Sequence, residues 1–339
     1  MTTAPEPANV TPERIFETLN AYQKTAALKT AIELDVFSAI ADGATTQASI
    51  AKRCQSSERG IRILCDYLVV NGFLLKNGQE YALADDSAVF LNRRSPAYLG
   101  EAAKFLALPE MINLYQDLTA IVRAGTSLKG EQSTNEPDSS KWVEFARSMS
   151  NLQRMTAVAV AETLCASAGE KWKVLDVAAG HGMYGVMIAK QNPNAEIFAL
   201  DWPEVLKVAH ENVKAAGVAA RHHHLPGSAF EVDFGNDYDI VLLTGFLHHF
   251  DPQTIETILR KVHTALKPGG RAVTVEFIPN EDRVSPPAPA AFSMIMLGTT
   301  RAGDSYTYSE YDKMFRNAGF TLNELRRSPG PQRFIISKK

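Results

Sequence analysis

Two adjacent histidines, His248 and His249, are the side chains best suited to acid–base chemistry in this sequence. Neutral histidine has a reference pKa of about 6.5, so it can accept a proton close to neutral pH. Both follow the apolar run Asp239–Leu243, which is typical of a buried parallel strand. Ligands of such sheets bind at the carboxyl ends of the strands. An arbitrary histidine is more often structural, but this position favours His248 as a catalytic base.

A glycine-rich loop follows a second apolar run, Lys173–Val177, and precedes a helical stretch. Its glycines at positions 180, 182 and 185 match the fingerprint of dinucleotide-binding loops. Asp201 lies at about the separation expected of the acid that binds the ribose. The loop could therefore hold a dinucleotide or S-adenosylmethionine (SAM), or it could be a tight turn without a ligand.

The charge at this loop distinguishes the two cofactors. A pyrophosphate requires positive potential at the helix N-terminus, whereas Asp176 would place a carboxylate at the mouth of the loop. SAM carries an ammonium and a sulfonium group and no phosphate, so an acid there favours SAM. Gly180 and Gly182 allow the backbone to approach its methionine part, and Asp201 can accept hydrogen bonds from both ribose hydroxyls.

The elements that must position these residues form an alternating pattern after residue 169. Two further apolar runs, Glu196–Leu200 and Arg271–Val275, are separated from the others by helical stretches. Short apolar runs that alternate with helices are typical of a parallel sheet. We therefore predict an open, doubly wound α/β sheet over residues 169–339.

Residues 1–95 predict helices followed by a hairpin. Thr11 and Pro12 are typical of a helix start, and an apolar stripe continues at helical spacing through Ile15, Leu19, Tyr22 and Ala26. Further helices are predicted over 31–40, from after Thr45-Thr46 to about Cys54, and from 56 or 57 to a stop at 71–72. Asn77-Gly78 lies between two short apolar runs and is a strong hairpin signal.

This outline also fits a winged helix, so a ligand-sensing DNA-binding regulator is an alternative. The charge of residues 1–90 argues against it, because eight Lys/Arg stand against eleven Asp/Glu. Phosphates would repel a recognition helix on an acidic domain. A packing or dimerisation role is the better interpretation.

The intervening residues 96–168 predict a helical connector with a polar break at Gly125–Ser140. After this break, five apolar residues fall on one helix face: Trp142, Phe145, Met149, Leu152 and Met155. Such stripes usually face a core, which is the interpretation preferred over ligand contact.

Five motifs together resemble those of class I SAM-dependent O-methyltransferases in order and spacing. They are Asp176–Gly182, Leu200–Pro203, Phe246–Phe250, Leu266–Gly270 and Glu276–Pro279. The resemblance covers nearly the whole chain and is strongest to plant phenolic and to bacterial natural-product and hydroxyneurosporene-type enzymes. It implies a Rossmann-like SAM-dependent methyltransferase domain, and an N-terminal, mainly α winged-helix-like dimerisation domain that forms an intertwined homodimer. It also implies an antiparallel last strand, for which Arg333–Ile336 is the candidate.

The resemblance assigns roles at the transfer site. His248 matches the family's general base, and Glu276 matches the first glutamate that supports it. The second glutamate expected in plant members aligns with Ser305, and the neighbouring Asp304 could substitute for it. His249 replaces the family's usual aspartate.

Cofactor and acceptor residues follow from the same resemblance. Gly227-Ser228 stands where the family usually has Gly-Asp, and Ala178 and Ala179 replace two loop glycines. The predicted cofactor-binding residues are Asp176, Gly180, Gly182, Asp201, Trp202, Ser228, Ala229, Phe230 and Thr244. Phe145, Met149, Phe292 and Met296 are predicted to surround a flat, largely apolar acceptor, with ordinary core packing as the alternative.

No metal site is predicted. His222, His223 and His224 are consecutive, and neighbours on an extended segment point to alternate sides. A solvated strand edge is therefore preferred over a metal cluster, and a metal held by His248 and His249 with a further ligand is a minor alternative.

Composition and charge exclude several classes of protein. A net charge of −3 lacks the basic excess of a nucleic-acid partner, and three cysteines are too few for a disulfide framework. Met1–Val10 lacks a signal-peptide pattern, and the most apolar helical stretch, Thr156–Ala168, is too short to span a bilayer. A cytoplasmic protein without membrane or nucleic-acid partners is expected.

The sequence therefore predicts a homodimeric SAM-dependent O-methyltransferase acting on a small aromatic or secondary-metabolite acceptor. Its predicted parts are a dimerisation domain over 1–95, a connector over 96–168 that contributes to the acceptor pocket, and a SAM-binding domain over 169–339. Alternatives are methyl transfer to carbon or nitrogen, the DNA-binding regulator and a nicotinamide-dependent oxidoreductase.

Overall fold

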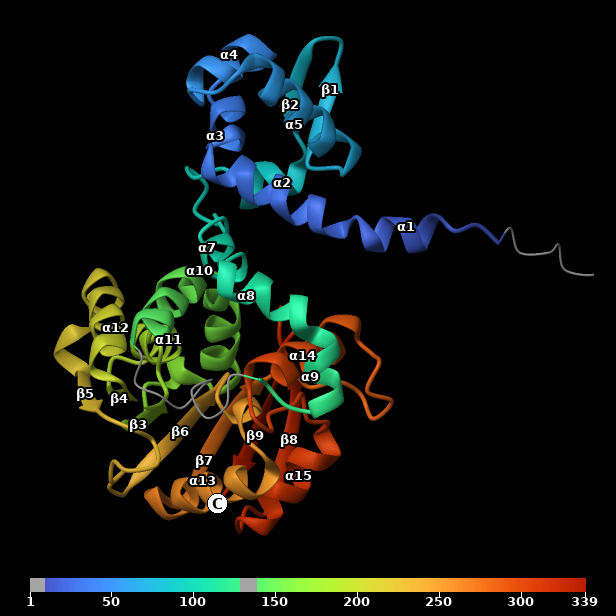
Figure 1. Cartoon of the computed structure of the whole chain (residues 1–339). Helices are drawn as coiled ribbons and strands as arrows, with labels where there is room; N and C mark the ends of the chain where they lie inside the picture. Colours follow the sequence, from blue (N-terminus) through green and yellow to red (C-terminus); the bar gives the residue numbers. More distant parts are fainter. Residues whose placement is uncertain (1–9, 129–138) are drawn as a thin grey trace, which may run out of the picture. The chain divides into compact units, whose positions relative to one another are not determined.

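The structure is a computed structural model that describes residues 10–128 and 139–339. It divides the chain into two compact units, residues 1–107 and residues 108–339 (Figure 1). The boundary between the two units falls inside the predicted connector. The division of the chain into three parts at residues 95 and 168 stays a prediction.

The first unit is helical apart from one hairpin. Its helices are α1 (Glu13–Leu19), α2 (Ala21–Glu33), α3 (Val36–Ala41), α4 (Gln47–Arg53), α5 (Glu58–Val70), α6 (Asp85–Phe90) and α7 (Ala102–Leu106). Its strands are β1 (Leu74–Asn77) and β2 (Glu80–Leu83), which pair antiparallel and confirm the predicted hairpin. Gly78 adopts a φ of +59° in the connecting turn, which glycine does without steric cost.

Two helix starts in this unit confirm the predictions. α4 begins after Thr46, whose hydroxyl accepts the Ser49 N–H while the Ser49 hydroxyl accepts the Thr46 N–H. α5 begins after Ser57, whose side chain accepts the Gly60 N–H. These caps satisfy N–H groups that have no partner within the helix.

The predicted cap at Thr11 and the predicted helix over 31–40 are wrong. α1 begins at Glu13, and the Thr11 hydroxyl bonds the Glu13 carboxylate at 3.1 Å rather than a backbone N–H. The helix predicted over 31–40 is two helices, α2 and α3. Asp35 between them has a φ of 59°, which a continuous right-handed helix cannot contain.

The core of the first unit lies among α2 to α5 and the hairpin, and it includes Phe37, Ile50, Ile61, Leu68 and Tyr81. The apolar stripe predicted from residue 15 is interrupted at Asn20 and lies outside this core. Ile15, Phe16, Leu19 and Tyr22 are each about 60–70% exposed. Among the described residues of this unit, no core cluster includes the stripe.

The second unit contains the large sheet. Its helices are α8 (Pro109–Leu114), α9 (Leu118–Ala124), α10 (Ser139–Thr163), α11 (Met183–Gln191), α12 (Pro203–Ala215), α13 (Pro252–Ala265), α14 (Pro287–Thr299) and α15 (Tyr308–Asn317), with 3₁₀ turns η1 (Tyr115–Asp117), η3 (Ala166–Ala168), η4 (Ala219–Arg221) and η5 (Leu247–His249). Its strands are β3 (Trp172–Val177), β4 (Ala195–Asp201), β5 (His222–Pro226), β6 (Tyr238–Thr244), β7 (Leu266–Glu276), β8 (Leu322–Arg327) and β9 (Arg333–Lys338).

The seven strands confirm the predicted α/β sheet. Their order is β5-β4-β3-β6-β7-β9-β8, with β3 to β7 parallel and with β9 antiparallel to both β7 and β8. The predicted last strand at Arg333–Ile336 is therefore confirmed, whereas β8 was not predicted. The chain order reverses between β3 and β6, and ligands of open α/β sheets bind at the carboxyl ends of strands at such a point.

Helices cover both faces of the sheet (Figure 1). α13 and α15 bury Ile258, Tyr311 and Phe315 on one face. α10, α11 and α12 bury residues such as Val160 and Ile188 on the other face. The carboxyl ends of the central strands are thus fixed between two apolar layers.

The apolar stripe on α10 is only partly core. Met149 is buried and Trp142 and Phe145 are half-buried, but Leu152 is 42% exposed and Met155 is 66% exposed. The core prediction is wrong for the last two, because the helix rotates them away from the sheet.

Of the polar break predicted at Gly125–Ser140, residues 129–138 lie outside the described residues, and Ser139 and Ser140 already belong to α10.

Within residues 10–128 and 139–339, no helix combines the length and the apolar character that crossing a membrane requires.

Gly185 sets the distance between α11 and the sheet. A Cβ at this position would lie 2.7 Å from Cγ2 of Ile197 on β4, which is closer than van der Waals contact allows. We expect Gly185→Ala to lower the free energy of unfolding by about 1–3 kcal/mol, as overpacking does. Urea unfolding followed by circular dichroism measures this. Lys190→Ala, on the exposed side of the same helix, is the control, and equal stability of both variants would contradict the close approach.

Candidate active site

His248 lies in η5, directly after β6, and the glutamate at the end of β7 holds its ring. Nδ1 of His248 is 2.5 Å from Oε2 of Glu276, and both side chains are buried. Oε1 of Glu276 accepts the N–H groups of Phe246 and Leu247 at 3.0 and 2.8 Å. An ionised carboxylate only accepts hydrogen bonds, so Nδ1 is the donor of this contact. The tautomer is assigned from this contact, and in a neutral imidazole of this tautomer Nε2 carries the lone pair.

The backbone of this turn is braced by the segment that follows α14. The Asp304 N–H donates to the carbonyl oxygen of His248 at 3.0 Å, and the Tyr306 hydroxyl donates to that of Phe250 at 2.7 Å. Gly303 passes so close that a Cβ there would be 2.2 Å from the His248 carbonyl oxygen. His248 therefore lies on a turn that is hydrogen-bonded both to Glu276 and to the segment after α14.

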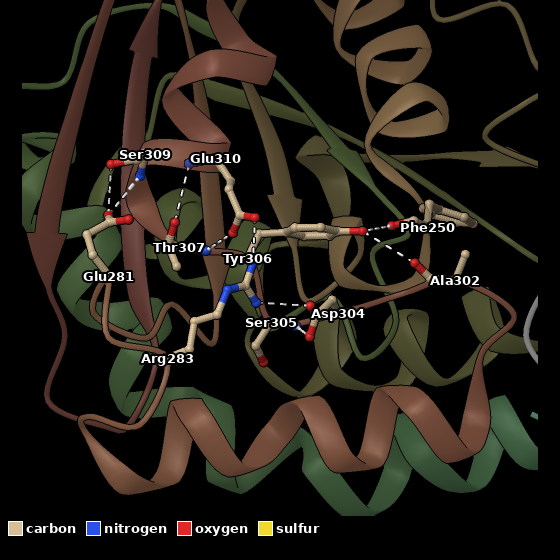
Figure 2. A network of polar contacts seen from close by, with 10 residues as sticks. All are labelled: Phe250, Glu281, Arg283, Ala302, Asp304, Ser305, Tyr306, Thr307, Ser309 and Glu310. Atoms are coloured by element: carbon tan, nitrogen blue, oxygen red, sulfur yellow. Dashed lines mark hydrogen bonds and ion pairs between the residues drawn. The ribbon is translucent and has the colours of Figure 1, made fainter. Parts of the chain in front are cut away.

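The carboxylate of Asp304 has another partner. Its Oδ2 accepts from Arg283 Nη1 at 3.1 Å, and the same guanidinium contacts Glu310 Oε1 at 2.5 Å (Figure 2). Asp304 thus contacts His248 through its backbone and Arg283 through its side chain. Ser305, which aligns with the family's second glutamate, is fully buried, and its hydroxyl has no hydrogen-bond partner among the described residues.

Aromatic side chains surround the two histidines. Phe292 of α14 meets the His248 ring edge to face, with 5.0 Å between centroids, and stacks on Phe277 at 4.0 Å. Trp142 of α10 meets the His249 ring edge to face at 5.6 Å. The sequence did not identify Phe277 as a site residue, although its position directly after Glu276 could have indicated it. It assigned Trp142 only to the core stripe.

The other predicted acceptor residues lie on the same two helices. Phe145 contacts Trp142 edge to face at 5.8 Å, and Met149 is buried on α10. Met296 is buried on α14, one turn beyond Phe292. The structure therefore brings Phe292 directly to His248, while acceptor contact by the other three residues stays a prediction.

His249 is half-buried beside His248, with 4.3 Å between the ring centroids. Burial lowers its pKa well below the usual range, and the charges of His248 and Lys141 act in the same direction. The ring is therefore neutral at physiological pH, and only His248 has a carboxylate partner that would stabilise a charged imidazole.

At the glycine loop, Asp201 connects the loop to the end of β4. Its Oδ2 accepts the Gly180 N–H at 2.8 Å, and its Oδ1 accepts the Trp202 N–H at 2.7 Å. Burial raises the pKa of Asp201 to about 6, against the opposing effect of these two N–H groups. Each oxygen keeps a further lone pair, so the carboxylate can also accept hydrogen bonds from a ribose.

Asp176 lies elsewhere than predicted. The sequence placed its carboxylate at the mouth of the loop, but it is fully buried, and Oδ2 lies 3.4 Å from where a Gly185 Cβ would be, under α11. Neither oxygen has a hydrogen-bond partner among the described residues. Burial raises the pKa of Asp176 to about 8, with the charge of Asp201 adding and the nearby Gly185 N–H opposing.

These features fit SAM. A Cβ at Gly180 would meet no atom closer than 4.0 Å, so the space over the loop is open. A buried acid without a partner lies beneath this loop, and Asp201 offers two acceptors at its edge. Carboxylates without a nearby cation suit a positively charged ligand and oppose a pyrophosphate.

The loop after β5 carries the residues predicted at the adenine. Phe230 donates its N–H to the Ser228 hydroxyl at 3.2 Å. The residue is 43% exposed, and its ring meets that of Phe250 edge to face with 5.2 Å between the centroids. Ala229 is buried, and Thr244 is half-buried at the end of β6. Trp202 packs in a cluster with Trp142, Val143, Ala146, Val205 and Val208, which joins the cofactor side to α10.

The histidine run on β5 is only partly a solvated edge. His223 and His224 are exposed, but His222 is buried, and its Nε2 lies 3.8 Å from the Gly185 Cβ position. The prediction is wrong for His222, because the strand begins beneath α11. In the parts of the chain that the structure describes, no three or more His, Cys, Asp and Glu side chains are placed to hold a metal ion.

Comparison with known proteins identifies the class. Residues 121–321 match the O-methyltransferase domain family, and residues 16–93 match the O-methyltransferase dimerisation domain. The first match covers more than half of the chain. The chain therefore belongs to the O-methyltransferase family.

Individual relatives agree with this assignment. The chain is 25% identical to the tetracenomycin polyketide synthesis 8-O-methyl transferase TcmO of Streptomyces glaucescens, over 97% of each chain. A solved structure of a candidate O-methyltransferase from Nostoc punctiforme superposes with a TM-score of 0.93 at 48% identity, covering 98% of this chain and 100% of that one. Human N-acetylserotonin methyltransferase in complex with SAM has the same fold, with a TM-score of 0.86 at 20% identity over 100% and 99% of the two chains.

The protein is thus a SAM-dependent methyltransferase with a Rossmann-like domain and an N-terminal helical dimerisation domain. This outcome confirms the predicted family, fold class and cofactor. It decides against the nicotinamide-dependent oxidoreductase and the DNA-binding regulator.

The unpaired Asp176 should make stability depend on pH. Its pKa is about 8 in the folded chain against about 3.8 as a free group, so the folded state binds one more proton between these values and stability falls as pH rises. Asp176→Asn removes this cost, so its advantage over the wild type should grow between pH 5 and pH 8, by at most about 1.4 kcal/mol per pH unit. Urea unfolding without SAM at four pH values measures this. Parallel stability curves would contradict the burial of an unpaired acid.

Proposed function

We propose that the protein transfers a methyl group from SAM to a hydroxyl oxygen of a small, flat, aromatic acceptor, with His248 as the general base. The observation that carries this proposal is the contact of 2.5 Å between His248 Nδ1 and Glu276 Oε2. It leaves Nε2 as a proton acceptor beside the aromatic wall of the site.

Bound SAM supplies an electrophilic methyl group, and the acceptor oxygen must become a nucleophile. His248 Nε2 takes the proton of the acceptor hydroxyl, and Glu276 stabilises the imidazolium that forms. The N–H groups of Phe246 and Leu247 hold Glu276 in place, so the ring need not reorient during proton transfer. Asp304 contacts this turn through its N–H, and its carboxylate pairs with Arg283. Its catalytic role stays a prediction.

The acceptor class follows from the side chains around His248. The stacked rings of Phe292 and Phe277 present an apolar wall beside the base, and flat rings pack well on such a wall. Phe145, Met149 and Met296 extend this surface from α10 and α14. Relatives that methylate aromatic hydroxyls support the assignment, including TcmO and the 3-hydroxy-5-methyl-1-naphthoate 3-O-methyltransferase of Streptomyces sahachiroi, which is 26% identical.

The cofactor is proposed to lie along the carboxyl ends of β3, β4 and β6. Asp201 accepts the ribose hydroxyls, and Gly180 and Gly182 allow close approach of the methionine part. Asp176 is a buried acid without a partner beneath the loop, and a cationic ligand there would favour its ionised form. Ser228, Ala229 and Phe230 line the adenine, with Trp202 and Thr244 at either side.

Methyl transfer to carbon is a second candidate. The L-tyrosine C(3)-methyltransferase of Streptomyces lavendulae is 26% identical over 201 residues, which is 58% of this chain. A phenol deprotonated by His248 has nucleophilic character at its ring carbon as well as at its oxygen. The position of the transferred methyl group distinguishes the two reactions.

We also propose that two copies assemble through the first unit. The dimerisation domain matches residues 16–93, and the exposed apolar stripe of α1 lies outside the core formed by the described residues of its unit. An exposed apolar stripe of this kind marks an interaction surface.

Replacing the base should remove most of the turnover without removing the cofactor. We expect His248→Ala to lower kcat about 10²- to 10⁴-fold and Glu276→Gln to lower it less, with SAM affinity within twofold of the wild type. Turnover of a panel of phenols with isotopically labelled SAM, followed by mass spectrometry and NMR, gives the rate and the methylated atom.

His223→Ala, at an exposed histidine on β5, is the control for this experiment. Near-full turnover by His248→Ala would refute the base role. A label on ring carbon instead of oxygen would favour the second candidate.

Charges on α1 should separate the two copies. We expect the double variant Phe16→Asp and Leu19→Asp to shift the mass in light scattering from two chains toward one, because the apolar stripe would no longer bury against a partner. Glu17→Ser on the same helix should leave the mass unchanged. A dimer that survives the double variant would show that α1 is not part of the interface.

A further inference from the structure

Lys261 on α13 makes contacts that the proposed chemistry has not used. Its Nζ donates to the carbonyl oxygens of Ala229 and Val232 at 2.9 and 2.5 Å, and lies 3.5 Å from that of Phe230. The ammonium also lies 4.1 Å from the centroid of the Phe234 ring. An ammonium has three N–H donors, so one side chain gathers three carbonyls of a single turn.

This ammonium is held by dipoles rather than by an acid. Among the described residues, no carboxylate lies within ion-pair distance of Lys261, and Asp233 acts on it only through its more distant charge. Burial lowers the pKa of Lys261, with Asp233 opposing. Burying the ammonium removes water from it, which costs free energy. Hydrogen bonds to the three carbonyls offset this cost only while those carbonyls stay in place.

The turn has few other bonds that would fix it. The N–H groups of Glu231 and Val232 both bond the Ser228 carbonyl, at 3.0 and 2.9 Å, and the Phe230 N–H bonds the Ser228 hydroxyl at 3.2 Å. These bonds close the turn on itself. The carbonyls of residues 229, 230 and 232 receive their bonds from Lys261. The lysine therefore supplies the hydrogen bonds that join the turn to α13, in addition to the apolar packing of Ala229 and Phe234 against that helix.

The same helix also begins close to the turn that carries His248. α13 begins at Pro252, after the cap Asp251, and thus four residues beyond His248. The rings of Phe230 and Phe250 meet edge to face at 5.2 Å. One helix thus fixes the distance between the turn after β5 and the turn that carries the base.

We propose that Lys261 is a positioning residue for the cofactor: by gathering the carbonyls of Ala229, Phe230 and Val232 it holds the adenine side of the SAM site in register with the His248 turn. This inference rests on the proposed placement of the adenine at Ser228–Phe230. Lys261 does not touch the reacting atoms. Its effect should appear in cofactor affinity before it appears in the chemical step.

The test compares Lys261→Met with Lys261→Arg. The methionine keeps the apolar stem and removes all three donors, whereas the arginine keeps positive charge and N–H donors. Titration calorimetry measures the Kd of S-adenosylhomocysteine and of 5′-methylthioadenosine, which retains the adenosine and lacks the amino-acid end. We expect Lys261→Met to raise both Kd values at least tenfold and Lys261→Arg to raise them less than threefold.

A second readout needs no ligand. In hydrogen–deuterium exchange of the free protein, the amides of Glu231 and Val232 should exchange faster in Lys261→Met than in the wild type. The matched control is Arg260→Met, the exposed neighbour on the same helix, which is paired with Glu256. It should leave both Kd values within twofold and the exchange of the turn unchanged.

The outcomes separate a positioning role from a purely structural one. A lower Tm with unchanged Kd values, measured below the transition, would overturn the proposal, as would equal losses in the Arg260 control. If Lys261→Met does not fold, Lys261→Gln, which keeps two donors without the charge, should show an intermediate Kd. Loss of affinity for S-adenosylhomocysteine but not for 5′-methylthioadenosine would contradict the adenine placement and leave the base role of His248 untouched.

Discussion

A buried glutamate at the end of β7 is the constraint on which the site depends. An ionised carboxylate away from water is costly unless it is fully hydrogen-bonded, and Glu276 meets this requirement with one imidazole and two backbone N–H groups. All three partners lie on the turn that follows β6. The adjacency of β6 and β7 in parallel register brings Glu276 and His248 together. The sheet order, the tight turn and the brace from Gly303 and Asp304 therefore serve one hydrogen-bonded unit.

Much of this arrangement could be predicted from the sequence, because it depends on patterns that are local. Short apolar runs predicted the central strands, Asn77-Gly78 predicted the hairpin, and Thr46 and Ser57 predicted helix starts. The meeting of His248 and Glu276 was predictable by a further step, since the carboxyl ends of parallel strands share one edge of a sheet. The family resemblance then assigned them roles that neither spacing nor periodicity could supply.

The features that could not be predicted depend on which other parts of the protein each helix face or side chain contacts. Helical spacing identified the stripe of α1 and that of α10, but spacing does not say whether a stripe meets its own chain, and both carry exposed residues. Asp176 was expected at an open mouth, yet the start of α11 covers it. The carboxylate of Asp304 pairs with Arg283, twenty-one residues earlier, and Phe277 stacks on Phe292 across a loop. These pairings depend on tertiary packing, which sequence distance does not encode.

The residues around His248 come from separate elements, and this separation bears on how the range of acceptors can change. Phe292 lies on α14, a helix outside the sheet, whereas Glu276 and the turn it holds belong to the sheet itself. The hydrogen bonds described for His248 and Glu276 all come from elements other than α14. Under the proposed mechanism, acceptor contact and proton transfer therefore depend on separate elements. A library of variants at α14 can explore new acceptors while the hydrogen bond between His248 and Glu276 is kept.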